Sequence, residues 1–171
     1  MERLQELQRL MTHGHCAESQ TELHNTHGDM RKMVACYIYY MRQCIQKGFP
    51  SLDYIRRYFG AQAAKYGGYC DIQGEITPQR DMVFVGDCDC QFTATGYNIH
   101  RCWLQHNSKL VAVATDHSHL HIDCFGNSEL VVRVTSPTAR VYVNQYGNSR
   151  CTIEGAYSDK ATVTIHNQET Y

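Results

Sequence analysis

A short repeat in the second half of the chain is the feature that most constrains its fold. From Asn107 onward, a small polar pair precedes alternating apolar residues about every ten residues, with one insertion near Pro137. Two successive decapeptides form the true unit, because Gly126-Asn127-Ser128 recurs as Gly147-Asn148-Ser149. The repeat therefore predicts coils of roughly twenty residues, each built from two short strands.

The alternation within each decapeptide indicates that one side of every strand is buried. A unit of this length cannot bury its apolar side alone, so successive units must stack and share one core. An antiparallel sandwich also has regularly spaced strands, but it does not require the same residue type at the same place in every second strand. We therefore predict an α+β chain in which residues 69–171 form a β-solenoid, with about four and a half coils from Met82 onward. The inward positions of this frame include Met82, Phe84, Cys90, Phe92, Ala94, Ile122 and Val132.

Residues 1–68 carry helical patterns and are expected to cap the N-terminal end of the solenoid. Leu4, Leu7 and Leu10 share one helical face, and Gly14 is expected to end that helix. Residues 13–27 are polar and punctuated by glycine, which predicts a linker or a broken turn.

Two further helices are expected in this region. An apolar stripe from Met30 to Ile45 predicts one long helix. Asp29 suits its positive N-terminal end, and Gly48 stands where a helix-ending glycine belongs. Ser51 is expected to cap the next helix, which carries Leu52, Ile55 and Phe59.

Composition restricts the compartment and the partners. A formal net charge of -1 gives no electrostatic footprint for nucleic acid or an anionic membrane, so neither is expected as a partner. No stretch approaches the ~18 apolar residues of a membrane-spanning helix, and the polar first residues do not resemble a signal peptide. Nine cysteines without a C-x-x-C pair predict free thiols and a reducing, cytoplasmic location.

Alternate decapeptides present two different outer surfaces. The first, here called the aromatic face, combines aromatic, charged and amide side chains, the mixture enriched at protein interfaces. The alternative is that its aromatic rings only stack from coil to coil and stabilise the ladder. The aromatic face comprises Arg101, Trp103, His121, Asp123, Phe125, Tyr142, Asn144 and Tyr146.

The second outer surface, the valine face, contains Val111, Val113 and Val131. It is more apolar than a free surface should be, so we expect the N-terminal helices or another subunit to cover it. The C-terminal coil is another candidate interface, because Val163 and Ile165 would lie at an uncapped strand edge. These features predict a homo-oligomer through that coil or through the valine face. The alternative is a monomer whose edge is blunted by residues 166–169.

The residues that could carry chemistry form no catalytic pattern. His119, His121 and Asp123 share the outer side of one strand and are weak candidates for a metal site. Neighbouring coils supply no clear third ligand, so no metal and no cofactor are expected. Cys102 and Cys124 fall at inward positions, where a free cysteine acts as a small hydrophobe. No G-x-S-x-G, P-loop or G-x-G-x-x-G motif occurs, so no enzymatic activity is expected.

The phrase Gly48-Phe49-Pro50-Ser51-Leu52-Asp53-Tyr54-Ile55, followed by decapeptides with Asn-Ser corners, resembles small uncharacterised proteins from Bacteroidetes genomes and their prophages. The resemblance covers nearly the whole chain, but its phrases are structural and imply no function. In architecture only, the chain is also similar to the bactofilins, polymer-forming cytoskeletal proteins whose solenoids stack end to end. The helical first third departs from the bactofilin pattern.

Three functions remain open as hypotheses. The first is a non-enzymatic protein-binding module of phage or mobile-element type that uses the aromatic face. The second is a self-assembling structural protein, such as a scaffold or a virion-associated component. The third is a carbohydrate-binding β-helix, because a row of aromatic side chains suits sugars.

Overall fold

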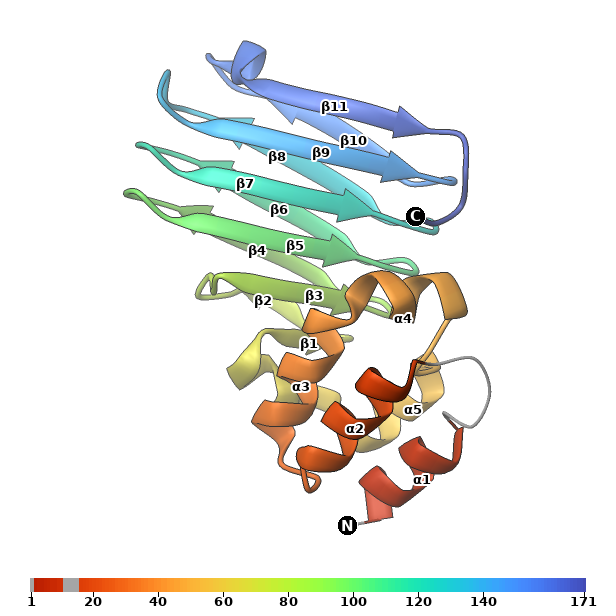
Figure 1. Ribbon diagram of the computed structural model, residues 1–171. Helices are drawn as coiled ribbons and strands as arrows, with labels where there is room; N and C mark the ends of the chain where they lie inside the picture. The colour runs from red at the N-terminus through yellow and green to blue at the C-terminus, as the bar shows by residue number, and fades with distance from the viewer. Residues whose placement is uncertain (1, 11–15) are drawn as a thin grey trace.

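The computed structural model describes residues 2–10 and 16–171 and has the predicted α+β architecture (Figure 1). A group of short helices lies at one end of a β-solenoid, and the strands of the solenoid stack away from it in chain order. The helical elements are α1 Glu2–Leu10, α2 Ala17–Asn25, α3 Met30–Tyr39, α4 Met41–Lys47, α5 Leu52–Tyr58 and the 3-10 helix η1 Gly60–Tyr66.

The predicted helix ends are confirmed where the structure describes them. The Asp29 side chain accepts a hydrogen bond from the Lys32 N–H at the start of α3. Gly48 ends α4 with a left-handed φ of 57°, a conformation that glycine adopts without a Cβ penalty. The Ser51 side chain accepts from the Tyr54 N–H and caps α5. The predicted end of the first helix at Gly14 lies outside the described residues.

Two helix predictions were wrong. Part of the predicted linker is α2, which Cys16 caps and which buries Leu23 against the other helices. The long helix expected from Met30 to Ile45 is two helices, because the chain leaves helical geometry at Tyr40 (φ −95°, ψ 20°). A broken helix keeps an almost continuous apolar stripe, so the pattern did not reveal the break.

The solenoid consists of two parallel sheets that share one core. One sheet has the order β1-β3-β5-β7-β9-β11 and the other has the order β10-β8-β6-β4-β2, which makes about five coils. We call them the odd sheet and the even sheet. Their strands are β1 Gly68–Cys70, β2 Gln73–Glu75, β3 Asp81–Val85, β4 Asp89–Ala94, β5 Ile99–Leu104, β6 Lys109–Ala114, β7 His119–Cys124, β8 Glu129–Val134, β9 Arg140–Tyr146, β10 Arg150–Glu154 and β11 Ala161–His166.

The first coil, formed by β1 and β2, precedes the predicted start at Met82. Its strands have three residues each, and β2 is exposed along its whole length, so no alternation marks it. From β3 onward the predicted frame is confirmed: Phe84, Ile122 and Val132 are 0% exposed and point into the core. Neighbouring coils are in register, as in the pairs Ile122 with Val143 and Val143 with Val163.

The corners explain the repeated small residues. Ser108, Ser128 and Ser149 are buried at the corner between the odd and the even sheet, where a larger side chain would not fit beside the apolar core. Gly126 adopts a φ of +65°, and a Cβ there would lie 3.2 Å from the His106 carbonyl oxygen. The corner motif is therefore set by space and backbone conformation.

The helices pack against the first coils of the solenoid, both at the end of its core and on the outer side of the odd sheet. Ala64 of η1 packs against the solenoid core, whereas Val34 of α3 and Ala63 of η1 pack with Val83 on the outer side of β3. Arg56 of α5 reaches the first corners and bonds the carboxylates of Asp71 at 2.7 Å and Asp87 at 2.9 Å.

Candidate functional site: the aromatic corner and the open coil

The odd sheet brings the aromatic face together in two rows. Register places Arg101 of β5, His121 of β7 and Tyr142 of β9 side by side. Trp103, Asp123 and Asn144 form the second row, two residues further along the same strands. Phe125 and Tyr146 follow at the corner, so all eight predicted residues lie on one side of the solenoid.

Part of the aromatic face is buried inside the protein. The rings of Phe125 and Tyr146 stack with their centroids 4.7 Å apart, and Tyr146 stacks on His166 at 4.3 Å. Phe125 and Tyr146 are only 4% and 5% exposed. The cross-coil stacking that we considered as an alternative is therefore present at this corner.

Tyr171 covers the aromatic corner. After β11 the chain runs back beside the corner toward α4 (Figure 1). There the Tyr171 ring meets Phe125 and Tyr146 in T-shaped contacts, with 5.1 Å and 5.4 Å between ring centroids. The Tyr171 hydroxyl donates to Asp123 at 2.5 Å and accepts from Trp103 Nε1 at 3.0 Å.

Helix α4 completes the surroundings of Tyr171. We call these surroundings, which include Trp103, Asp123, Phe125 and Tyr146, the tyrosine cradle. The Arg42 guanidinium lies over the Tyr171 ring, 5.5 Å from its centroid, and Gln46 Nε2 donates to the Tyr171 carbonyl at 3.2 Å. Burial, with the Asp123 carboxylate beside it, raises the pKa of the Tyr171 phenol, which therefore stays a hydrogen-bond donor at neutral pH. Sequence reasoning missed Tyr171 as a member of this site.

The remaining part of the aromatic face is exposed but internally paired. Arg101 bonds Asp81 at 2.5 Å, and the His121 and Tyr142 rings stack at 5.0 Å. Asn144 donates to Asp123 at 2.8 Å. Each of these polar side chains therefore already has a partner within the protein.

The weak metal candidates do not converge on one point. Asp123 directs its carboxylate to Tyr171 and Asn144, while His121 stacks on Tyr142 and His119 lies on the same strand. Within residues 2–10 and 16–171, no group of three or more His, Cys, Asp or Glu side chains could hold a metal ion.

The valine face is not covered by the helices, as we had considered. Val111, Val113 and Val131 are half-exposed on the outer side of the even sheet, whereas the helices lie at the N-terminal end of the solenoid (Figure 1). Charged residues flank the valines on the same strands, including a Lys109–Glu129 pair at 3.5 Å.

The coil formed by β10 and β11 is the last of the stack, and its strand edges that face away from β8 and β9 are open. Among the strands of the described residues, β10 pairs with β8 alone and β11 pairs with β9 alone. Val163 takes the inward position of Val143 one coil later, yet Val163 is 38% exposed and Val143 is 2% exposed. Ile165 is 69% exposed, and the inward-facing Cys151 and Ile153 are half-buried. We call this surface the open coil.

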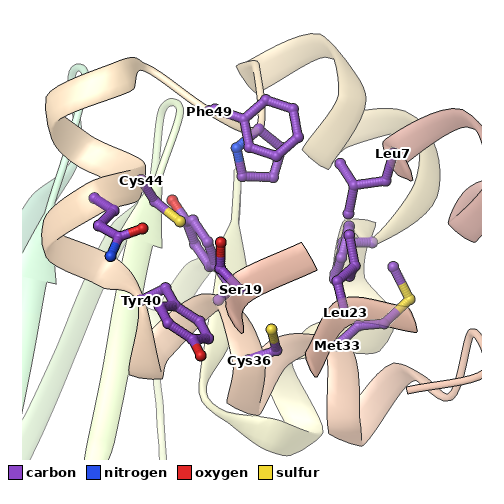
Figure 2. A pocket seen from close by; sticks show the side chains of 12 residues that line it. Leu7, Ser19, Leu23, Met33, Cys36, Tyr40, Cys44 and Phe49 are labelled. Atoms are coloured by element: carbon purple, nitrogen blue, oxygen red, sulfur yellow. The ribbon is translucent and has the colours of Figure 1, made fainter. Parts of the chain in front are cut away.

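A small cavity among the helices is too small for a substrate (Figure 2). It has a volume of about 40 Å³ and lies between apolar side chains that include Leu7, Leu23 and Met33 on one side and Cys36 and Cys44 on the other. Sites for drug-sized ligands have volumes of roughly 300 Å³ or more. The cavity is therefore a packing gap that could hold at most a few waters.

The two cysteines predicted to point inward behave as core residues. All nine cysteines are unpaired, and Cys102 and Cys124 are buried at the predicted inward positions. Burial raises the pKa of the Cys124 thiol well above its ordinary value, which keeps it protonated and unreactive.

Comparison with known proteins adds no relative. No protein-family model matches the chain, and searches of curated proteins and of solved structures give no significant match. None of the described helices is long and apolar enough to cross a membrane.

Proposed function

We propose that this protein is a non-enzymatic scaffold that assembles with a second copy of itself through the open coil. The observation that carries the proposal is the exposure of inward-facing residues in that coil, above all Val163 at 38% and Ile165 at 69%. Exposed apolar side chains beside unpaired strand edges favour pairing with another chain.

The two ends of the solenoid differ in the way that this proposal requires. At the N-terminal end, η1 packs on β1, and the exposed edge strand β2 is only three residues long and polar (Gln73-Gly74-Glu75). Short polar edges are a common protection against unwanted pairing. At the other end β10 and β11 have five and six residues and an apolar inner side.

This asymmetry favours a closed pair of copies over a filament. A head-to-tail filament would need an open coil at both ends, but the helices occupy the N-terminal end. A continuous polymer of stacked solenoids is therefore not part of this proposal. The net charge of -1 opposes association only weakly.

The aromatic face is less suited to bind a partner protein, because its most apolar residues already bind Tyr171. A binding module on this face would have to use the exposed residues Arg101, His121 and Tyr142. A carbohydrate would meet the same restriction. The free thiols suit the cytoplasm as the location of the assembled protein.

Light scattering with a matched pair of variants tests the assembly. The parent chain at ~100 μM, a concentration that populates dimers with Kd values in the micromolar range, is expected to have the mass of two copies. Val163→Lys should give the mass of one copy, and Val113→Lys on the valine face should leave the dimer intact.

Two outcomes would overturn the proposal. A parent chain that is monomeric at this concentration would leave the exposed part of the aromatic face as the better interface. A dimer that Val113→Lys dissociates, and Val163→Lys does not, would move the interface to the valine face.

A further inference from the structure

The open coil is complementary to itself when a second copy meets it in the antiparallel direction. This inference rests on the proposed assembly and concerns its geometry. It follows from three features of β10 and β11: the direction of the unpaired backbone groups, the sequence order within each strand, and the place of each strand's centre.

The unpaired backbone groups belong to the inward-facing residues. At the start of β10 the Arg150 N–H donates to the Ser128 carbonyl of the preceding coil at 2.9 Å. Since backbone groups of successive strand residues point to opposite sides, those of Cys151 and Ile153 face away from β8. In β9 the Arg140 N–H likewise donates back to Ser118 at 3.0 Å.

The same alternation fixes the unpaired groups of β11. Val141 follows Arg140 and therefore directs its N–H and C=O forward, toward β11. Registered partners in these parallel ladders share one direction, and Val141 is registered with Ala161. The backbone groups of Ala161, Val163 and Ile165 therefore face the open side.

An antiparallel ladder satisfies these groups in both strands at once. If β11 pairs with the partner's β11 about Val163, then Val163 opposes Val163, and Ala161 opposes Ile165, all as hydrogen-bonded pairs. If β10 pairs with the partner's β10 about Thr152, Cys151 opposes Ile153 as hydrogen-bonded pairs. Every opposed pair also lies on the same side of the sheet, inward with inward and outward with outward.

The charges of β10 agree with this register. Arg150 and Glu154 are the outward residues at its two ends, so the antiparallel pair would place each Arg150 opposite the partner's Glu154. Glu154 already accepts from Arg133 through Oε2 at 3.0 Å, which leaves Oε1 for a second donor. Opposite charges that face each other across a pair of strands stabilise it.

One two-fold axis can serve both strands. Val111 stands three residues before the end of β6 and Ile122 three residues after the start of β7, so they are level across the core. In the even sheet Val111 is registered with Val131, and Val131 with Thr152. In the odd sheet Ile122 is registered with Val143, and Val143 with Val163. The two strand centres, Thr152 and Val163, are therefore level with each other.

The shape of the open coil favours this axis over the other antiparallel choice. The short 3-10 helix η2 Ser158–Lys160 rises beyond β11 at the turn between β10 and β11 (Figure 1). An axis parallel to the strands would pair β10 with the partner's β11 and bring the two η2 helices into the same space. An axis through Thr152 and Val163 places each η2 at the opposite rim.

We propose that two copies join tail to tail about a two-fold axis through Thr152 and Val163, so that β10 pairs with β10 and β11 with β11. The two solenoids then form one continuous core that is closed at both outer ends by helices. The assembly is isologous, since each copy contributes the same surface.

Disulfide cross-linking tests the register. Thr152 opposes itself as a non-hydrogen-bonded pair, whose Cα atoms are about 4.5 Å apart, close enough for a disulfide. Thr152→Cys is expected to form a covalent dimer under mild oxidation, visible by non-reducing electrophoresis. Thr162 opposes Thr164, so Thr162→Cys alone should not cross-link, and the double variant Thr162→Cys with Thr164→Cys should.

The controls separate this inference from the assembly itself. The parent chain, treated in the same way, must stay uncross-linked, because its nine cysteines would otherwise obscure the result. Light scattering of each reduced variant must show the mass of two copies. A dimeric Thr152→Cys protein that gives no covalent dimer would overturn the register and leave the assembly standing, whereas a monomeric parent would overturn both.

Discussion

Trp103 donates a hydrogen bond from its indole Nε1 to the Tyr171 hydroxyl at 3.0 Å, although 68 residues separate them in the chain. The bond ties the segment after β11 to β5, three strands back along the odd sheet. With Arg42 and Gln46 it also joins that segment to α4. Tyr171 therefore connects the two ends of the fold.

Removing this link should destabilise the whole protein. Tyr171→Ala is expected to lower the free energy of unfolding by about 2 kcal/mol, because it exposes Phe125 and Tyr146 and removes one of the two donors to Asp123. Tyr171→Phe should cost about half as much, since the ring remains. Urea denaturation followed by tryptophan fluorescence measures both values, as Trp103 is the single tryptophan.

Tyr97 provides the matched control. Its ring stacks on His117 at 4.3 Å but is 82% exposed, so Tyr97→Ala should change the stability by less than ~0.5 kcal/mol. Equal losses from Tyr97→Ala and Tyr171→Ala would show that Tyr171 does not occupy the cradle in solution.

The inward frame of the solenoid can be tested with one charge at two positions. Ile122→Asp places an unpaired carboxylate in the core and should cost several kcal/mol, on the order of the whole stability of a small domain. Thr93→Asp places it on the exposed side of β4 and should cost less than ~1 kcal/mol. Similar losses of melting temperature in the two variants would reject the frame.

Thr115 is a poorer outer control than its position suggests. Its hydroxyl donates to the Ala94 carbonyl of the preceding coil at 2.9 Å, and Thr135 repeats the bond to Ala114 at 3.2 Å. A substitution there removes a bond between coils, so its effect would not measure exposure alone. Thr115 and Thr135, twenty residues apart, thus make the same bond between successive coils.

The fold could be predicted because its pattern is periodic. Alternation within β4 to β9 fixes which side chains are buried, and the corner serines and glycines fix where the strands end. The first coil lacked both signals, since its strand Gln73-Gly74-Glu75 has no alternation of apolar and polar residues. The break at Tyr40 lay within an unbroken apolar stripe.

The candidate site could be predicted only in part. The side on which Trp103, Asp123 and Phe125 lie could be predicted, because successive side chains along a strand point to opposite faces of the sheet. The burial of Phe125 does not, because it depends on Tyr171, which approaches through a segment that has no repeat. Contacts between a non-periodic segment and several coils leave no mark in a single sequence.

Acid should weaken the link between α5 and the solenoid. The Arg56 guanidinium beside Asp71 lowers the pKa of that carboxyl to about 2, from about 3.9 in an unfolded chain. A lowered pKa contributes stability that is complete above the unfolded value and is lost as the pH falls through the folded value.

The difference in unfolding free energy between the parent and Asp71→Asn reports this contribution. It is expected to be constant above about pH 5 and to shrink between about pH 4 and pH 2. Urea denaturation at a series of pH values measures the difference. A difference that does not change across this range would show that the ion pair is absent in solution.

Amide hydrogen exchange at two protein concentrations tests the central claim, that the open coil is where two copies meet. We predict that exchange in β10 and β11 slows at the higher concentration, most at Val163, Ile165 and Ile153, while β5 and β7 exchange at the same rate in both samples. Unchanged exchange in β10 and β11, with slowing on the valine face or nowhere at all, would contradict the account.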